Sequence, residues 1–111
     1  MGTMMNKLIV LLAFCSGLAH AEFKDGNELF QLLTSRDTLD RVDALGYVTG
    51  VADALRGTIH CISANATAGQ ISDMTLAYLR RNPENRHLPA DVIIAVVLKN
   101  TWPCKKGGQS L

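Results

Sequence analysis

The sequence predicts an all-α fold, a small disulfide-stapled bundle of about four helices. Apolar residues recur three and four positions apart in several segments, which is the spacing of one helix face. Residues typical of helix starts and helix ends bound these segments. Two cysteines remain once an N-terminal export segment is set aside, and two lone cysteines in a small exported domain most often pair.

The N-terminus has the order of a secretory signal peptide. Lys7 supplies a positive charge, residues 8–14 form a continuous apolar run, and Ala19-His20-Ala21 is a cleavage site of the small-x-small kind. We therefore expect residues 1–21 to direct export to the periplasm and to be cleaved off after Ala21. The fold is then that of the mature chain.

Two other interpretations of this segment are weaker. A membrane anchor needs roughly 20 apolar residues, and the run here is much shorter. A lipoprotein would use Cys15, but Phe14 before it is bulky where lipoprotein cleavage requires a small residue. The mature protein is expected to be one helical domain, residues 22–104, followed by a disordered tail, residues 105–111.

The charge balance excludes some classes of partner. All acidic residues lie after residue 21, and removal of Lys7 leaves as many basic residues as acidic ones, so the mature chain carries no formal net charge. No field of a single sign attracts nucleic acid or an anionic bilayer. We expect no nucleic-acid partner, and no membrane contact after the signal peptide is cleaved.

Cys61 and Cys104 are expected to form the disulfide bond. It would close a loop of about 43 residues, which the chain-entropy description values at about 4 kcal/mol. That is comparable to the stability margin of a domain this small. Zinc ligation and a catalytic thiol are the alternatives. The sequence has no CxxC or clustered Cys/His spacing for zinc, and a paired cysteine is not a nucleophile.

The first two helices follow from local start signals and apolar spacing. Asp25, followed three residues later by Glu28, resembles a helix cap and predicts a short helix to about Ser35. A longer helix is predicted to begin near residues 37–38 and to end near residues 57–61. Its predicted buried face consists of Leu39, Val42, Leu45, Val48, Ala52, Leu55 and Ile59.

A third helix follows a loop at residues 62–66. Thr67 and Gln70 have the spacing of a capping box, in which each side chain bonds the other's backbone N–H. The apolar pattern continues to Leu79, and the run from Arg80 to Pro83 stops the helix. The third helix is therefore bounded by a capping box at its start and by a proline at its end.

The fourth segment is ambiguous from its pattern alone. Residues 92–98 are apolar and rich in β-branched side chains, which would also suit a buried strand. No other segment offers a partner strand, so we predict a central helix that starts at Pro89, is buried on nearly all sides, and ends at Pro103. The disulfide then joins the ends of the second and fourth helices, which must run roughly parallel or cross, while short connections make sequential neighbours antiparallel.

Small residues form a stripe on the second predicted helix. Glycine inside a helix costs about 1 kcal/mol relative to alanine, so the repetition requires a reason. Close approach of another helix of the same bundle is the preferred explanation, and a homodimer seam is the alternative. Asp53, which flanks the stripe, is expected to form an ordinary solvated pair with Arg56, and the alternative is that either residue anchors an interface. The stripe consists of Gly46, Gly50, Ala54 and Gly57.

The sequence carries no catalytic signature. His60 and His87 have no serine, free cysteine or carboxylate at a catalytic spacing, and no phosphate loop, HExxH, nucleophile elbow or paired-carboxylate motif is present. We therefore expect no enzyme activity, no cofactor and no metal. The polar, proline-bounded stretch at residues 80–88 is the best candidate for a recognition loop, against the alternative of an ordinary helix connection.

Several short motifs, taken together in their order and spacing, resemble the Rap/Tai immunity family. These are periplasmic proteins that protect bacteria from peptidoglycan amidase effectors delivered by type VI secretion. The resemblance runs from about Phe23 to Cys104. It rests on GYVTGVADA at residues 46–54, Cys61, TAGQ at residues 67–70, Tyr78-Leu79, Asn82-Pro83, His87-Leu88-Pro89-Ala90 and Pro103-Cys104.

The resemblance implies an all-α homodimer, with a disulfide, that occludes the active site of a cell-wall amidase effector. We expect the recognition loop to make this contact. The main alternative is an acid-activated periplasmic chaperone, and the second is a weak enzyme that would need an activated Cys61. The candidate effector-binding residues are Asn82, Glu84, Asn85, Arg86 and His87.

Overall fold

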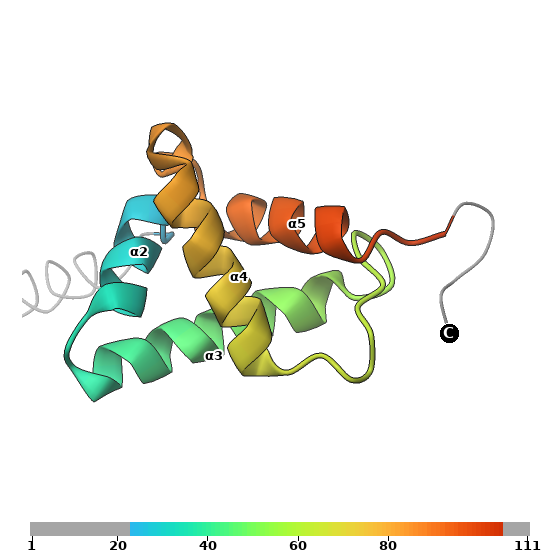
Figure 1. Cartoon of the computed structure of the whole chain (residues 1–111), viewed down its shortest axis with the longest axis horizontal. Helices are drawn as coiled ribbons and strands as arrows, with labels where there is room; N and C mark the ends of the chain where they lie inside the picture. Colours follow the sequence, from blue (N-terminus) through green and yellow to red (C-terminus); the bar gives the residue numbers. More distant parts are fainter. Residues whose placement is uncertain (1–22, 106–111) are drawn as a thin grey trace, which may run out of the picture.

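The computed structural model describes residues 23–105, and in this range the chain is all-α, as predicted (Figure 1). No helix in the range is long and apolar enough to cross a bilayer. The expected signal peptide, and the expected tail apart from Lys105, lie outside the described residues. The elements are α2 (Gly26–Thr34), α3 (Thr38–Leu55), α4 (Ala68–Arg81), the 3-10 turn η1 (Pro83–Asn85) and α5 (Ala90–Thr101).

Local capping fixes where the helices begin. The Asp25 side chain accepts a hydrogen bond of 2.8 Å from the Glu28 backbone N–H, which satisfies one of the unpaired donors at the start of α2. At α4, Thr67 and Gln70 form the predicted capping box, with both reciprocal hydrogen bonds present. Both predicted starts are therefore confirmed.

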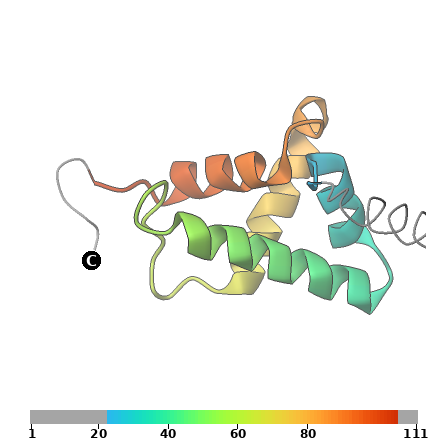
Figure 2. The ribbon, with the colours of Figure 1, turned by 180° about the vertical axis from the view of Figure 1, so that it is seen from behind.

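The two helices joined by the disulfide lie side by side and run in the same direction, which is one of the two arrangements, parallel or crossing, that the disulfide predicted (Figures 1 and 2). Helix α4 crosses both of them steeply on one face, and α2 packs against the ends where α3 and α5 begin. The expected antiparallel order of sequential neighbours is wrong for α3 and α4. Their connection, residues 56–67, is long enough to let the chain turn across the layer instead of folding straight back.

The core lies between α4 and the α3–α5 layer, with Leu29 of α2 closing one end. The buried apolar side chains on α3 are small, which lets neighbouring helices come close to its axis, whereas α4 and α5 contribute larger ones. Buried apolar residues include Ala44, Val48 and Ala52 on α3, Ile71 and Leu79 on α4, and Ile93, Ile94 and Leu98 on α5.

The predicted buried face of α3 is partly wrong. Leu39 is 75% exposed and Val42 is 58% exposed, although Val48 and Ala52 are buried as expected. The chain buries the row that contains Ala44 instead, which turns the leucine and valine near the helix start toward solvent. Likewise α5 is not buried on nearly all sides, because Val92 and Val96 are exposed on the side that no helix of residues 23–105 covers.

Helix α3 is also shorter than predicted. It ends at Leu55, and the chain then turns at Gly57, whose φ of 82° lies in the left-handed region that favours glycine. Gly57 therefore belongs to the turn after the helix, and the stripe on α3 is reduced to Gly46, Gly50 and Ala54.

Candidate functional site

The candidate recognition stretch, residues 80–88, begins inside α4, because Arg80 and Arg81 are the last two residues of that helix. The candidate recognition loop itself is residues 82–88, and it connects α4 to α5 at the end of α4 that lies farthest from α3 (Figure 1). Asn82 closes α4, and Pro83 begins η1, where its fixed φ suits the first position of a helical turn and its missing N–H costs nothing. Backbone hydrogen bonds from Arg86 to Pro83 and from Leu88 to Asn85 keep the turn compact.

The backbone of this loop is held against the start of α2. The Asn27 N–H donates to the Arg86 carbonyl at 2.8 Å, and the Gly26 N–H donates to the Leu88 carbonyl at 2.9 Å. These two carbonyls satisfy helix-terminal donors that would otherwise lack partners. A Cβ atom on Gly26 would lie 2.7 Å from the Arg86 carbonyl oxygen, so the close approach requires glycine. The loop thus has a defined position relative to the helical body.

Three of the five predicted effector-binding residues are engaged within the chain. The Arg86 guanidinium donates to the Leu79 carbonyl at 2.7 Å and lies 3.9 Å over the ring of Phe30. The Asn82 side chain donates to the Tyr78 carbonyl, and the Asn85 side chain donates to the Tyr78 hydroxyl. These side chains therefore stabilise the shape of the loop.

Glu84 and His87 are the exposed members of the predicted set. The ion pairs in the described chain are Lys24–Asp43 and Asp53–Arg56, so neither of these two side chains is in one. The loop therefore presents a carboxylate and an imidazole on a backbone that is already ordered. Sequence reasoning missed Gly26 and Phe30, because their role depends on contacts with residues about 60 positions away along the chain.

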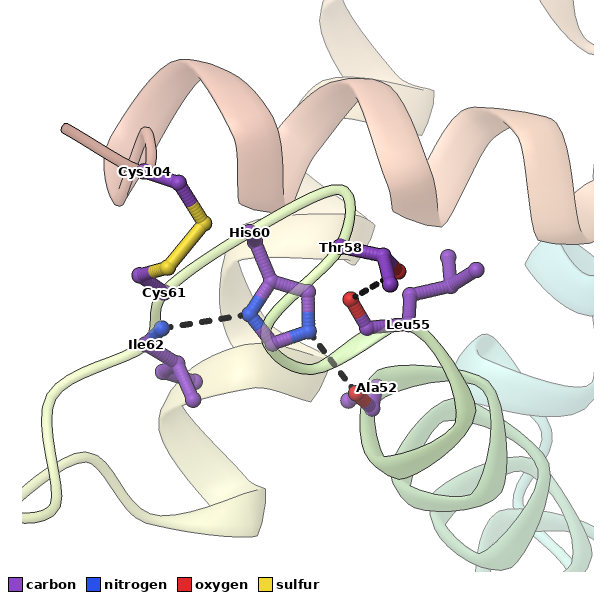
Figure 3. Close-up of a disulfide and its surroundings, with 7 residues drawn as sticks. All are labelled: Ala52, Leu55, Thr58, His60, Cys61, Ile62 and Cys104. Atoms are coloured by element: carbon purple, nitrogen blue, oxygen red, sulfur yellow. Dashed lines mark hydrogen bonds between the residues drawn. A yellow bond between two sulfur atoms is a disulfide. The ribbon is translucent and has the colours of Figure 1, made fainter. Parts of the chain in front are cut away.

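The opposite end of the molecule is held by the predicted disulfide between Cys61 and Cys104, beside the buried His60 (Figure 3). The Ile62 N–H donates to His60 Nδ1 at 3.2 Å, so the proton of the neutral ring lies on Nε2, which donates to the Ala52 carbonyl at 2.7 Å. His60 therefore caps the end of α3 and connects this helix to the loop segment that carries Cys61.

This environment gives no indication of catalysis. The described residues contain no group of three or more His, Cys, Asp or Glu side chains that could hold a metal ion. Both ring nitrogens of His60 bond to backbone groups, and both described cysteines are paired. The histidine and the disulfide have structural roles.

No contact within the described part of the chain explains the glycines of α3. A Cβ atom on Gly46 or Gly50 would meet nothing within 4 Å in the described chain. The preferred explanation, close approach of another helix of the same bundle, is therefore wrong for these two positions. The predicted Asp53–Arg56 pair is present at 3.4 Å, with both side chains largely exposed, so it contributes little to stability.

Tyr47 lies next to this stripe and connects α3 to the start of α5. Partial burial raises the pKa of its hydroxyl above the ordinary value, and the negative charge of Asp91 adds to the rise. Hydrogen bonding to the Asp91 backbone acts in the opposite direction but does not cancel the other two effects. The Lys24 ammonium lies 5.3 Å from the centre of the ring. The phenol therefore stays neutral at physiological pH.

Comparison with known proteins identifies a family for this chain. A family model described as Rap1a immunity proteins matches residues 11–104. A comparison with curated proteins finds no match. The family match spans most of the chain and includes every described helix, the candidate loop and both paired cysteines. The chain belongs to the Rap1a immunity protein family.

Proposed function

We propose that this chain is a periplasmic immunity protein that binds and inhibits a peptidoglycan amidase effector of a type VI secretion system, without catalysis of its own. The observation that carries the proposal is the family match over residues 11–104. The loop at residues 82–88 supports the proposal, because backbone hydrogen bonds hold it against α2. An inhibitor that enters an enzyme cleft binds best when its inserted segment is already ordered.

The loop has features that suit a concave active site. It protrudes beyond α4, its backbone is held by α2, and its exposed side chains can form hydrogen bonds. Glu84 can pair with cationic groups or accept from N–H donors, and His87 can donate or accept. In an effector of different sequence these groups would be left desolvated and unpaired, which gives specificity for the cognate enzyme.

The test is to replace Glu84 and His87 together by alanine and to measure inhibition of the purified product of the neighbouring effector gene. Both side chains are exposed, so thermal stability should be unchanged. We expect inhibition to weaken by at least tenfold, about 1.4 kcal/mol. Arg86 stays in place, because its loss would disturb the contact with Phe30 and confuse a binding effect with a folding effect.

A matched control replaces Glu28 and Arg36 by alanine, since these are also exposed charged residues but lie on α2 and the turn after it. The control should inhibit as well as the wild type. If the loop variant stays within about threefold of the wild type, below 1 kcal/mol, the loop is not the inhibitory element. If the wild type neither binds the effector nor inhibits it, the proposed function is wrong.

Export is part of the proposal. The expected cleavage after Ala21 would release a chain that begins at Glu22, and the paired Cys61 and Cys104 suit the oxidising periplasm. The mass of the protein isolated from the periplasm checks this directly. A chain that retains residues 1–21, or one that is found in the cytoplasm, contradicts it.

We also propose a homodimer formed through α3. Leu39 and Val42 are exposed, and Gly46 lies seven and four residues after them, hence on the same side of the helix. In an antiparallel pair, Leu39 would meet the partner's Gly50 and Val42 would meet the partner's Gly46. The same surface then supplies both the protruding side chains and the flat floor, which is the self-complementarity that a twofold interface needs.

A further inference from the structure

A groove follows α4 from the loop after α3 toward the recognition loop. One hollow of about 490 Å³ lies between residues 63–66, the first half of α4 and Trp102. A second of about 350 Å³ lies between the second half of α4 and the last turns of α5. Asp73 and Met74 line both hollows, so the two lie next to each other along α4, and we refer to them together as the groove. The loop, α4 and the end of α5 that border it are visible in Figure 1.

The groove has the dimensions of an extended peptide. It follows α4 from Gln70 to Arg81, which spans about 16 Å at 1.5 Å per residue. An extended chain rises about 3.3 Å per residue, so about five residues would fill this length. Met74 and Ala77 form the apolar part of the α4 wall, and Val97 of α5 lies at the base. Alternate side chains of a peptide could therefore be buried in it.

The charges along the groove are arranged in a fixed order. Asp73 lies where the two hollows meet, and Arg81 lies at the end next to the recognition loop. The Arg81 Nε donates to the Ala77 carbonyl, and neither residue is in an ion pair within residues 23–105. The two residues are eight positions apart on the helix, so their backbone positions are separated by about 12 Å along the axis. The groove thus presents a negative charge and a positive charge that have no ion-pair partner among the described residues.

We propose that this groove binds an extended segment of the effector that carries a basic residue and, four positions away, an acidic residue. The inference rests on the proposed function, and it adds a second contact surface to the recognition loop. In an extended chain, residues four positions apart point to the same side and lie about 13 Å apart, which matches the separation of Asp73 and Arg81. The basic residue pairs with Asp73 and the acidic residue pairs with Arg81.

The groove and the recognition loop form one surface. Arg81 is the last residue of α4, and Asn82 directly after it begins the loop. A single effector can therefore place one segment in the groove while its active-site cleft receives the loop. The groove would then contribute specificity outside the cleft, because an effector with a different charge order leaves Asp73 or Arg81 buried without a partner.

The test reverses each charge separately and measures affinity for the purified product of the neighbouring effector gene at low and high salt. Asp73→Lys and Arg81→Glu should each weaken binding by about tenfold at low salt, and less at high salt, because screening weakens exposed charge pairs. Arg36→Glu is the matched control for Arg81, since Arg36 is an exposed arginine in the turn after α2 and does not line the groove. Glu28→Lys is the control for Asp73.

Circular dichroism and thermal melting confirm that each variant is folded, and hydrogen exchange adds a readout that needs no substitution. In the wild-type complex, amides of α4 and of the last turn of α5 should become protected. If the wild type binds the effector but the groove variants bind as well as their controls, or no protection appears there, the groove proposal is wrong and the immunity function stands. If the wild type does not bind the effector, both proposals fail.

Discussion

At the scale of single residues, His60 replaces backbone hydrogen bonding where α3 ends. Its ring bonds the Ala52 carbonyl and the Ile62 N–H, and the side chain is fully buried. Removal of the ring would leave a donor and an acceptor unpaired inside the protein and would open a cavity. The sequence shows only a histidine beside a cysteine and does not indicate this role. Its structural role depends on how the chain turns after Leu55.

We predict that His60→Ala lowers the free energy of unfolding by about 3 kcal/mol, from the unpaired groups and the cavity together. His87→Ala is the matched control, because His87 is exposed, and we expect it to change stability by less than about 0.5 kcal/mol. Urea unfolding monitored by circular dichroism measures both values. Equal stability of the two variants would show that the hydrogen bonds of His60 do not hold the end of α3.

Gly26 allows the recognition loop to lie close to α2, and the atoms around it predict the effect of replacing it by alanine. The added Cβ would lie 2.7 Å from the Arg86 carbonyl oxygen and 2.9 Å from its Cα, and these backbone atoms cannot move without the loop. We predict that Gly26→Ala costs about 2 kcal/mol and also weakens inhibition. Gly69→Ala is the control, because its nearest neighbour is at 3.8 Å and alanine is the better helix former. A more stable Gly26→Ala variant would contradict the close approach.

At the scale of helices, the capping residues predicted the helix starts correctly, whereas the spacing of apolar residues did not predict the buried face of α3. The caps at Asp25 and Thr67 were predictable because a capping side chain and its backbone partner lie three residues apart, so no tertiary information is needed. The buried face of α3 was not predictable from apolar spacing, because the apolar residues lie on more than one side of the helix. Which side is buried depends on where α4 crosses, and that depends on the long connection before it.

The exposed face of α3 leads to a prediction about assembly. If Gly46 and Gly50 form the floor of a dimer seam, Gly50→Leu should produce a folded monomer, because its side chain has open space in the single chain but would collide with the partner's helix. Arg80→Leu places the same side chain on an exposed position of α4 and should leave the dimer intact. Analytical ultracentrifugation measures both. A wild-type chain that stays monomeric at millimolar concentration contradicts the seam.

At the scale of the whole molecule, backbone hydrogen bonds stabilise one end of the α3–α5 layer, and a disulfide stabilises the other. Backbone hydrogen bonds join α2 to the loop where α5 begins, and Cys61–Cys104 joins the chain where α3 and α5 end. The pairing of the cysteines was predictable from their number and the expected compartment. The hydrogen bonds between α2 and the loop at the other end were not predictable, because they involve backbone groups and the close approach at Gly26, and no side chain in the sequence indicates them.

The disulfide leads to the last prediction. The bond connects residues 43 positions apart, so replacing both cysteines by serine restores the conformational freedom of a long loop to the unfolded chain, worth about 4 kcal/mol. The hydrogen bond from the Cys61 N–H to the Trp102 carbonyl can remain, and the folded variant should keep its helical spectrum. Because a domain this small has a margin of only several kcal/mol, its unfolded fraction rises and periplasmic proteases should degrade it faster.

Urea unfolding and the half-life in periplasmic extract measure the two effects, with the single change Ser63→Ala, in the same exposed loop, as the control. An unchanged urea midpoint, or two free thiols detected by alkylation in the exported wild type, would show that the staple does not stabilise this protein.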